Sequence, residues 1–458
     1  MMVLTGLVCP PLLFSIELML YPRLLITLAG ICCGGFAWAQ ADETENVSAR
    51  YQITYNTQMH PAFRSEVSGM NSMSAAADRM FTFSATAHWG ARVWDGGEVY
   101  FNPELAAGVP FAGNLVGLGG FTNGEITRAA GNQPKPYVQR LFLRQTWNQG
   151  GGQEKVDGDF NQMAGFVDKN RFVLTAGNFS TLDVFDDNAY AKDPRTQFMN
   201  WGNWTYAAYD YAADARGFGV GLAGELYRGD WVFRFARMTG PKEPNGLQMD
   251  FALAKHYGDQ IEVEHAHTWG DQPGKVRVLA WRNRAVLASY SEATAYLQAH
   301  PAIKQSFFDV RQGEKIKYGL GVNLEQAITP DVGYFLRAMK ADGKTETYAF
   351  TEVDDSISTG VRLAGSLWGR ANDVVGVAWL RNGLSSQRRQ FLEAGGVSYF
   401  IGDGRLSYQP EQILETFYSW QVKPGVWLTG DVQRIQNPAY NALRGPVTVF
   451  ALRAHAEF

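Results

Sequence analysis

The sequence predicts an all-β protein whose antiparallel strands close into a transmembrane barrel. Three observations predict this fold. The N-terminus carries the pattern of an export signal, the rest of the chain repeatedly alternates its side chains with period two, and the last alternating segment ends on the aromatic residue Phe458. Period two places successive side chains on opposite faces of a sheet, and export directs such a sheet toward the cell envelope.

The N-terminal segment is predicted to be a signal peptide. Residues 24–36 form a short apolar run after Arg23, and Ala37-Trp38-Ala39 has the small-x-small pattern of a signal peptidase site. We therefore expect residues 1–39 to be removed and residues 40–458 to form one barrel domain. Met19 would give a more usual start for the signal. The alternative is a retained membrane anchor over residues 12–38, which Arg23 interrupts.

Composition excludes several classes of protein. Cys9, Cys32 and Cys33 all precede the predicted cleavage site, so the mature chain has no thiol for a disulfide or a thiolate metal site. The formal net charge is only −4, which argues against nucleic acid as a partner. Aromatic residues reach 13 % and glycines number 49, a composition that suits a β protein.

The period-two alternation is clear in several segments. In residues 47–57 the odd positions are mostly apolar or aromatic and the even positions are polar, and residues 81–91, 316–324 and 357–367 show a similar division. Counting such segments gives sixteen strands, or eighteen if two weak segments are admitted. An even number is expected for a bacterial single-chain barrel, because both termini then lie on one side of the membrane.

A soluble β-sandwich would alternate in the same way, and three features favour the membrane barrel. The segments are roughly ten residues long, as tilted spanning strands are. Aromatic residues lie near predicted strand ends, as in Tyr418 with Trp420, Trp427, and Tyr399 with Phe400, which is typical of an interfacial girdle. The final segment alternates up to a terminal Phe458, as closing strands of such barrels do.

Three long insertions interrupt the strands, at residues 102–135, 178–214 and 285–312. The third contains a predicted short helix over 290–300, with Ser289 or Ser291 near its N-terminal cap. The second is the most complex, because acidic, basic and aromatic residues alternate there over a few positions. Function is therefore expected to lie in the second insertion.

The motifs of this segment resemble those of a known family. Residues 177–200 contain G-x-F, D-x-F-D-x-N and D-P-R-x-Q-F-x-N, and residues 210–217 read D-Y-A-A-D-A-R-G. With residues 433–441 and 60–65, they are similar to the carbohydrate-selective porins of the OprB type over the mature chain. The resemblance implies sixteen strands, loops folded inward to a narrow charged constriction, and passive diffusion of glucose-like mono- and oligosaccharides.

The chemistry of the segment suits a sugar. Hydroxyl groups both donate and accept hydrogen bonds, and the C–H faces of a sugar ring stack on aromatic rings. The residues predicted to line the substrate pathway are Asp183, Phe185, Asp186, Asp187, Asn188, Tyr190 and Lys192.

Other charged residues are expected in the barrel wall or as braces. Arg140 and Arg144 alternate with Leu141 and Leu143, so both arginines should face the lumen and join the pathway, because a charge facing lipid at mid-depth costs about 2–4 kcal/mol. Similar alternation places Arg234, Arg362, Arg453 and His455 in the lumen. The residues expected to brace the loop against the wall are Asp193, Arg195, Asp210, Asp214 and Arg216.

The sequence leaves other functions open. The sequence has no Gly-x-Ser-x-Gly elbow and no His-Glu-x-x-His site, so no enzyme is expected, and His265 with His267 lacks an evident third metal ligand. Neither a metal nor a cofactor is predicted. The alternatives are an outer-membrane barrel that binds or exports polysaccharide, a general porin, or a channel for aromatic acids or small anions, which a strongly basic constriction would favour.

The expected location is the outer membrane of a Gram-negative cell. The expected partners are small carbohydrates, outer-membrane lipid and lipopolysaccharide. A homo-oligomer is left open by the sequence.

Overall fold

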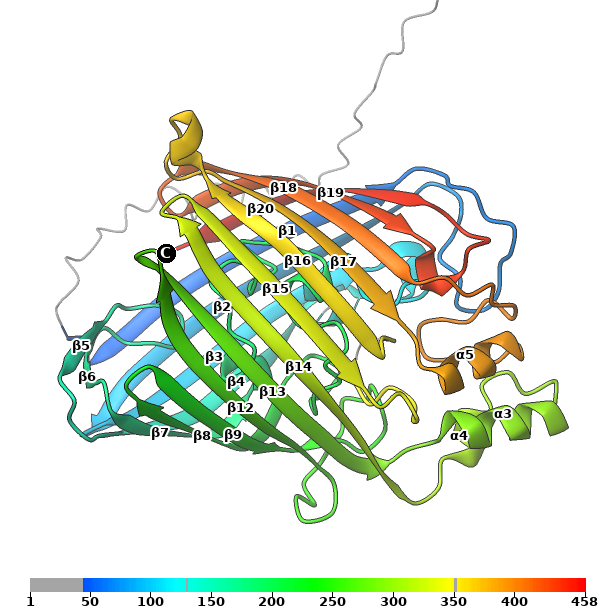
Figure 1. Ribbon diagram of the computed structural model, residues 1–458, viewed down its shortest axis with the longest axis horizontal. Helices are drawn as coiled ribbons and strands as arrows, with labels where there is room; N and C mark the ends of the chain where they lie inside the picture. Colours follow the sequence, from blue (N-terminus) through cyan, green and yellow to red (C-terminus); the bar gives the residue numbers. More distant parts are fainter. Residues whose placement is uncertain (1–43, 129–130, 350–351) are drawn as a thin grey trace, which may run out of the picture. The chain divides into compact units, whose positions relative to one another are not determined.

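A computed structural model describes residues 44–128, 131–349 and 352–458. Sixteen strands form a closed barrel, and each is antiparallel to its neighbours (Figure 1). They are β1 (Val47–His60), β2 (Asp78–Trp94), β3 (Gly97–Val109), β4 (Gly131–Asn148), β7 (Arg171–Phe179), β8 (Gly219–Arg228), β9 (Trp231–Met238), β12 (Tyr257–Trp269), β13 (Gln272–Val286), β14 (Glu314–Thr329), β15 (Val332–Ala341), β16 (Asp355–Ala364), β17 (Val374–Gly383), β18 (Glu411–Lys423), β19 (Val426–Gln436) and β20 (Val447–Glu457).

The seam of the barrel joins its first and last strands. Strand β1 pairs with β20 from Gln52 opposite Glu457 to Met59 opposite Phe450. Closure leaves no edge of unpaired backbone groups, which lipid could not satisfy. The fold confirms the prediction of sixteen strands. Two short pairs lie outside the barrel, β5 (Gln153–Val156) with β6 (Gly165–Asp168) and β10 (Gly240–Pro241) with β11 (Met249–Asp250).

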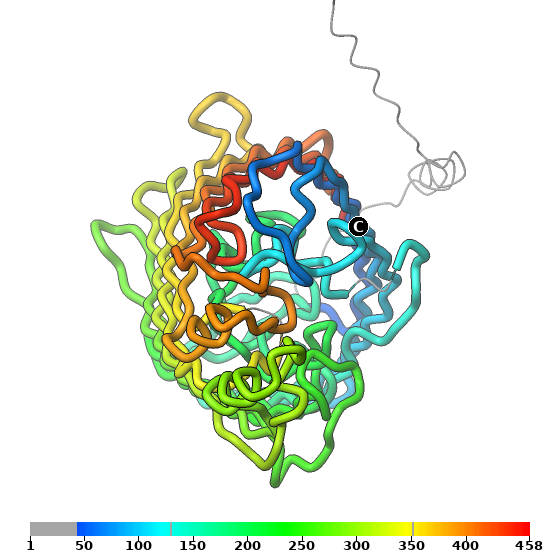
Figure 2. Tube along the Cα trace, turned by 90° about the vertical axis from the view of Figure 1, so that its right-hand side faces the viewer, coloured from blue at the N-terminus to red at the C-terminus, as the bar shows by residue number. Residues whose placement is uncertain are grey.

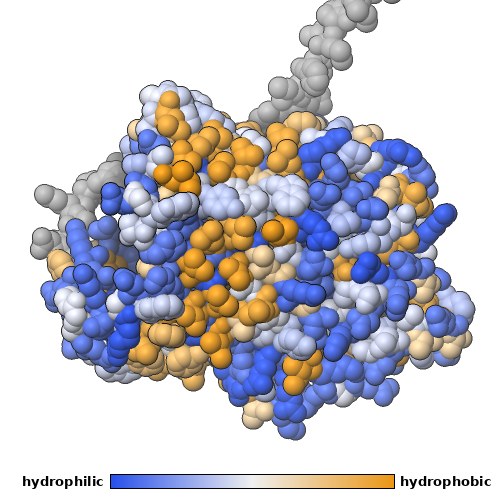
Figure 3. All heavy atoms as spheres, in the orientation of Figure 1, coloured by the Kyte–Doolittle hydropathy of each residue, from blue (hydrophilic) through white to orange (hydrophobic). Residues whose placement is uncertain are grey.

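The two faces of the sheet differ as the alternation predicts. On β1 the polar side chains of Gln52, Thr54 and Asn56 are buried in the barrel, whereas Tyr51 and Tyr55 are exposed outside. On β20, Arg453 and His455 are buried and Phe450 and Leu452 are exposed. Figure 3 shows the result as a band of apolar side chains over the strands, between hydrophilic surfaces at the two ends.

The barrel has two unlike ends. The terminal end carries the start of β1 and the end of β20. The opposite loop end carries most of the long connections and the helices α3 (Tyr290–Ala299), α4 (Phe307–Val310) and α5 (Ser386–Glu393). Helix α3 confirms the predicted helix, and its cap is Ser289, whose side chain accepts a hydrogen bond from Glu292 N.

The predicted insertions are shorter than expected, because residues at their ends belong to the flanking strands. Residues 102–109 belong to β3 and residues 131–135 to β4, because the Gly- and Asn-rich composition hid the strand pattern there. Tyr399 and Phe400 are not girdle residues. They lie in the connection from β17 to β18, where Tyr399 packs on Phe307 and Phe400 on Phe121. The turn 149–170 at the terminal end is long, which the sequence did not predict.

None of the helices in the described part of the chain has the length and hydrophobicity that a membrane crossing needs. The predicted signal peptide and the start at Met19 lie outside the described residues.

Candidate functional site

The connection from β7 to β8, residues 180–218, folds into the barrel and is called the inner loop. Figure 2 looks onto the loop end and shows cyan and blue-green segments inside the ring of strands. The inner loop begins with a 3₁₀ turn, Thr181–Asp183, closed by a capping box in which the Ser180 side chain accepts from Leu182 N and Ser180 N donates to Asp183. It also holds the short helix α2 (Trp201–Trp204), capped by the Asn200 side chain.

Contacts with strands on several sides hold the inner loop. Arg195 donates to Glu104 on β3 and to Glu125, each at 2.8 Å. On another part of the wall, Glu415 of β18 accepts from Met199 N at 2.6 Å and from Asn200 N at 3.1 Å. Further wall contacts include Lys317 of β14 with Asp210 at 2.7 Å, Arg337 of β15 with Asp186 at 2.8 Å, and Arg453 of β20 with the carbonyls of Pro194 at 2.7 Å and Gln197 at 2.9 Å.

Aromatic packing completes this anchoring. Tyr206, Tyr209 and Tyr211 are buried between the loop and the wall, and the Tyr209 ring lies 5.9 Å from that of Trp281 on β13. Strand β14 has glycine at position 321, where a Cβ would lie 2.9 Å from the Tyr206 ring. The glycine therefore lets the loop approach the wall closely.

A cavity of about 170 Å³ lies between the inner loop, β4 and the neighbouring connection from β3 to β4. Its walls combine four basic, two acidic and three aromatic side chains, which are Arg128, Arg140, Lys192, Arg216, Asp183, Asp193, Trp201, Trp204 and Tyr211. Such a set offers charged hydrogen-bonding groups and flat apolar surfaces together. A polar solute with apolar faces would meet partners for both there.

The central polar pair of the cavity is Arg140 with Asp183. Arg140 Nε donates to Oδ2 of Asp183 at 2.7 Å and Nη2 donates to Oδ1 at 2.6 Å. Burial opposes ionisation of Asp183, but the Arg140 guanidinium outweighs it and holds the pKa of this carboxyl below its usual range. The pair is therefore charged at neutral pH, and a quarter of the Asp183 side chain is exposed.

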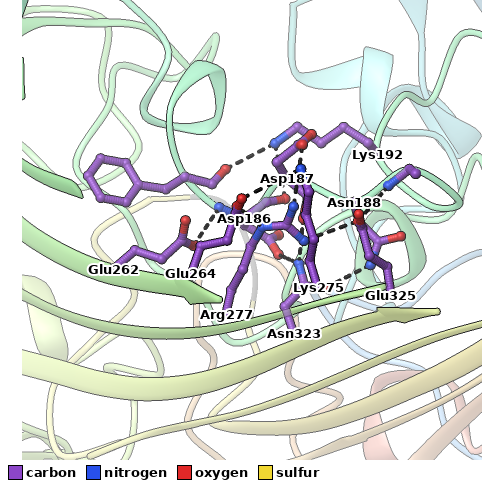
Figure 4. Close-up of polar contacts among 12 residues, drawn as sticks. Asp186, Asp187, Asn188, Lys192, Glu262, Glu264, Lys275, Arg277, Asn323 and Glu325 are labelled. Atoms are coloured by element: carbon purple, nitrogen blue, oxygen red, sulfur yellow. Dashed lines mark hydrogen bonds and ion pairs between the residues drawn. The ribbon is translucent and has the colours of Figure 1, made fainter. Parts of the chain in front are cut away.

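Asp187 lies on the other side of the inner loop, opposite a charged wall (Figure 4). More than half of its side chain is exposed, and its carboxylate lies 3.6 Å from Arg277 Nη2. The wall continues with Arg277 to Glu264 at 2.7 Å and Arg277 to Glu325 at 3.1 Å. Arg234 joins it through Glu225, Glu262 and Glu264, each at 3.0 Å.

Other residues predicted for the pathway are withdrawn from it. Phe185 and Asp186 have no exposed surface, and Asn188 has 1 %. Asp186 accepts hydrogen bonds from Arg337, Asn323 and Thr205. These contacts consume its lone pairs, so its carboxylate has no surface to offer to a solute.

Tyr190 and Lys192 are partly buried. The Tyr190 ring packs on Gly333, where a Cβ would lie 2.1 Å from it. Lys192 borders the cavity, but Nζ already donates to the carbonyls of Leu182, Phe185 and Asp186. Its ammonium therefore closes a turn of the inner loop.

Arg144 faces the lumen as its alternation with Leu141 and Leu143 implies, but away from the cavity. Its guanidinium lies 5.3 Å from the Tyr100 ring and donates to Asn161 O at 2.8 Å. Asn161 belongs to the long turn at the terminal end, and next to it the Phe160 ring packs 4.4 Å from that of His88 on β2. Arg144 thus holds this turn against the inside of the wall.

The residues predicted as braces divide into three groups. Arg195 and Asp210 pair with the wall, as described. Asp193 and Asp214 instead accept from backbone N–H groups of the loop itself, Arg195 N at 2.9 Å and Phe218 N at 3.0 Å. The Arg216 guanidinium lies 4.4 Å from the Tyr137 ring of β4 and has no hydrogen bond or ion pair within the described residues. Arg216 therefore borders the cavity with free donors.

Sequence reasoning missed Arg128, Trp201, Trp204 and Tyr211, which line the cavity. The two tryptophans lie between the motifs of residues 177–200 and 210–217, three positions apart, and this spacing could have indicated that they share one site. Arg128 comes from another connection, and no local pattern marks it. Among the described residues, no group of three side chains with metal-ligating chemistry comes together, and His265 and His267 lie with ring centroids 6.3 Å apart.

A closed barrel with an apolar exterior, a charged interior and a loop folded into the lumen defines an outer-membrane diffusion channel. The family described as "carbohydrate-selective porin, OprB family" matches residues 70–458, and the chain belongs to it. The protein is a sugar porin of the outer membrane. Its terminal end accordingly faces the periplasm and its loop end faces the outside of the cell.

Solved structures support the fold. The high-pH structure of Pseudomonas putida OprB is 14 % identical, with a TM-score of 0.62 over 90 % of this chain and 94 % of that chain. The outer-membrane channel DcaP of Acinetobacter baumannii is 8 % identical, with a TM-score of 0.50 over 90 % of this chain and 97 % of that chain. No curated protein is significantly similar to the chain in sequence.

Proposed function

We propose that the cavity beside the inner loop is where the channel selects small glucose-like sugars, by passive diffusion and without a catalytic step. The observation that carries the proposal is the Arg140–Asp183 pair beside Trp204 and Tyr211 in one cavity of about 170 Å³. Asp183 supplies acceptors, Arg140 and Arg216 supply donors, and the rings supply surfaces for C–H faces.

The main experiment is swelling of liposomes that contain the purified protein, with glucose, maltose-series sugars and size-matched amino acids. We expect sugars to enter faster than amino acids of the same size. Equal rates for all solutes would identify a general porin. No swelling with any solute would favour a barrel that binds or exports polysaccharide.

Variants connect the selectivity to the cavity. Asp183→Asn should reduce the preference for sugars over amino acids, because it removes the bidentate ion pair with Arg140. Asp157→Asn is the matched control, since its side chain is 89 % exposed in the turn at the terminal end. Equal discrimination in the two variants would contradict the role of the cavity.

A second candidate substrate class is carboxylated sugars. Four basic side chains and two acidic ones border the cavity, so the balance of charge there is basic although the inner-loop sequence is rich in aspartate. The reason is that Asp186 and Asp210 are paired with Arg337 and Lys317 of the wall. Faster flux of gluconate than of glucose, lost in Arg216→Gln, would establish this class instead of neutral sugars.

A further inference from the structure

The outer face of the barrel carries a groove of about 1190 Å³ near the loop end, over strands β8, β9 and β12–β15. Its floor is a row of outward side chains across four strands, set by the register of Phe235 with Ile261, Ile261 with Ala280, and Ala280 with Leu320. Ala280 is small and its neighbours in the row are large, which leaves a depression in an otherwise apolar surface.

The next row toward the loop end is charged. Arg237 lies opposite Asp259, and Asp259 lies opposite Arg282. Both arginines bind this one carboxylate, with Arg237 at 2.7 and 2.9 Å and Arg282 at 2.9 and 3.1 Å. Tyr257 supports the pair, because the Arg237 guanidinium lies 3.9 Å from its ring.

This cluster leaves basic charge directed outward. Two guanidinium groups share one carboxylate, and 43 % of the Arg237 side chain and 51 % of the Arg282 side chain are exposed. Lys340 is exposed on β15, beside Leu320, and has no ion pair within the described residues. Two further carboxylates lie near it, Asp342 at the edge of the groove and Asp355, which pairs with Arg381 at 2.6 Å.

The position of the charged row restricts its surroundings. Arginine on the lipid face costs about 2–4 kcal/mol at mid-depth and close to nothing at the interface, so this row marks the headgroup level. The loop end faces outside, so the headgroups it meets belong to the outer leaflet. Strand β14 separates Arg282 from Lys340, and the two positions are offset by two residues along it, so their backbones lie roughly 12 Å apart by the interstrand spacing and the rise per residue.

We propose that this groove binds an anionic glycolipid of the outer leaflet, a lipopolysaccharide, with phosphate groups at Arg237, Arg282 and Lys340 and an acyl chain over Ala280. The charges select this occupant over a second copy of the chain. The same face of another barrel, related by a two-fold axis, would bring more arginine and lysine against this rim, whereas a phosphorylated headgroup supplies the opposite sign.

The test measures binding of purified short-chain lipopolysaccharide to the detergent-solubilised porin by native mass spectrometry, with a dephosphorylated preparation alongside. Each of Arg282→Ala and Lys340→Ala should weaken binding about fivefold, the factor that corresponds to 1 kcal/mol per basic side chain at an anionic lipid surface. Lys340→Ala breaks no ion pair of the described structure, so its effect is independent of folding.

Two further variants separate recognition from structure. Asp259→Asn should tighten binding, because it frees both guanidinium groups, whereas a merely structural ion pair would give no gain. Arg434→Ala is the matched control, an exposed arginine on β19 that donates to Thr448 away from the groove. Its binding should equal that of the wild type.

Some results would overturn the proposal. Equal binding of the phosphorylated and dephosphorylated lipids would overturn it, as would unchanged binding in both alanine variants. A disulfide-linked dimer formed by Ala280→Cys in native membranes would show that a second copy covers the groove instead.

Discussion

Two walls of the lumen hold carboxylates in different ways. On strands β9–β14, Glu262, Glu264 and Glu325 are matched by the guanidinium groups of Arg234 and Arg277. On β18, Glu411 and Glu415 have neutral partners. Glu415 accepts from two backbone N–H groups and from Asn203, and Glu411 accepts from Gly119 N and Ala439 N.

The difference lies in how each wall holds the inner loop. The paired charges on β9–β14 are buried beside Asp187, and Glu262 and Glu325 also accept from Asp186 N and Ala189 N of the inner loop. The carboxylates on β18 hold the inner loop and its neighbours in place, because they accept from backbone N–H groups and from the Asn203 side chain, which would otherwise be buried without an acceptor. Both walls therefore hold the inner loop, one through carboxylates that are also paired with arginine and the other through carboxylates with neutral donors.

The largest expected effect comes from Asp186→Ala, which removes the partner of Arg337. Arg337 is 1 % exposed, and an unpaired buried charge costs about 3–5 kcal/mol. We expect the barrel to lose its folded position on an unheated gel at a markedly lower denaturant concentration. We also expect larger fluctuations of the single-channel current, because the inner loop is held less firmly. Asp187→Ala is the control, and equal denaturant concentrations for the two variants would contradict a bracing role for Asp186.

The next effect tests the β18 wall. Glu415→Ala leaves Met199 N and Asn200 N without an acceptor, which costs about 1–3 kcal/mol for each buried group. We expect larger single-channel conductance and weaker discrimination between sugars and amino acids. Glu415→Gln keeps one acceptor oxygen and should lie between alanine and wild type. A wild-type conductance in the alanine variant would show that other contacts suffice to hold the loop.

A smaller effect is expected on ion selectivity, from the exposed Asp187 beside Arg277. Asp187→Asn removes one exposed negative charge, so the ratio of cation to anion permeability should fall by about two- to fivefold, as a charge worth up to about 1 kcal/mol implies. Reversal potentials across a salt gradient measure this ratio. Stability should not change. An unchanged ratio would place the permeating ions away from Asp187.

The smallest expected effect is a loss of sugar discrimination at low pH. Arg140 keeps the pKa of Asp183 below its usual range, so the carboxylate stays ionised as the pH falls to about 4 and is neutralised only below that. Sugar discrimination should therefore be constant from neutral pH to about pH 4 and decline below it. Asp183→Asn should show the low value at every pH. A decline centred near pH 6 would contradict the pairing.

Period-two alternation predicted the strands, because lipid outside and water inside impose it on every strand, and the strand length, the aromatic strand ends and the terminal Phe458 predicted the barrel. The alternation also placed Arg140, Arg144, Arg234 and Arg453 in the lumen correctly. The motif segment located the inner loop, but not which aspartates it exposes. Asp186 and Asp187 are adjacent and equal in chemistry, yet one meets Arg337 from β15 and the other faces the open lumen, and only the fold brings β15 to that position.

The contact of Arg453 has a consequence for assembly. Its guanidinium binds the carbonyls of Pro194 and Gln197 from the strand that also pairs with β1 along the seam. The inner loop is thus anchored by β20, the strand that closes the barrel. Closure of the barrel and docking of the inner loop are therefore coupled. If β20 pairs with β1 before the inner loop has entered the lumen, the contacts of Arg453 with the loop do not yet stabilise the seam.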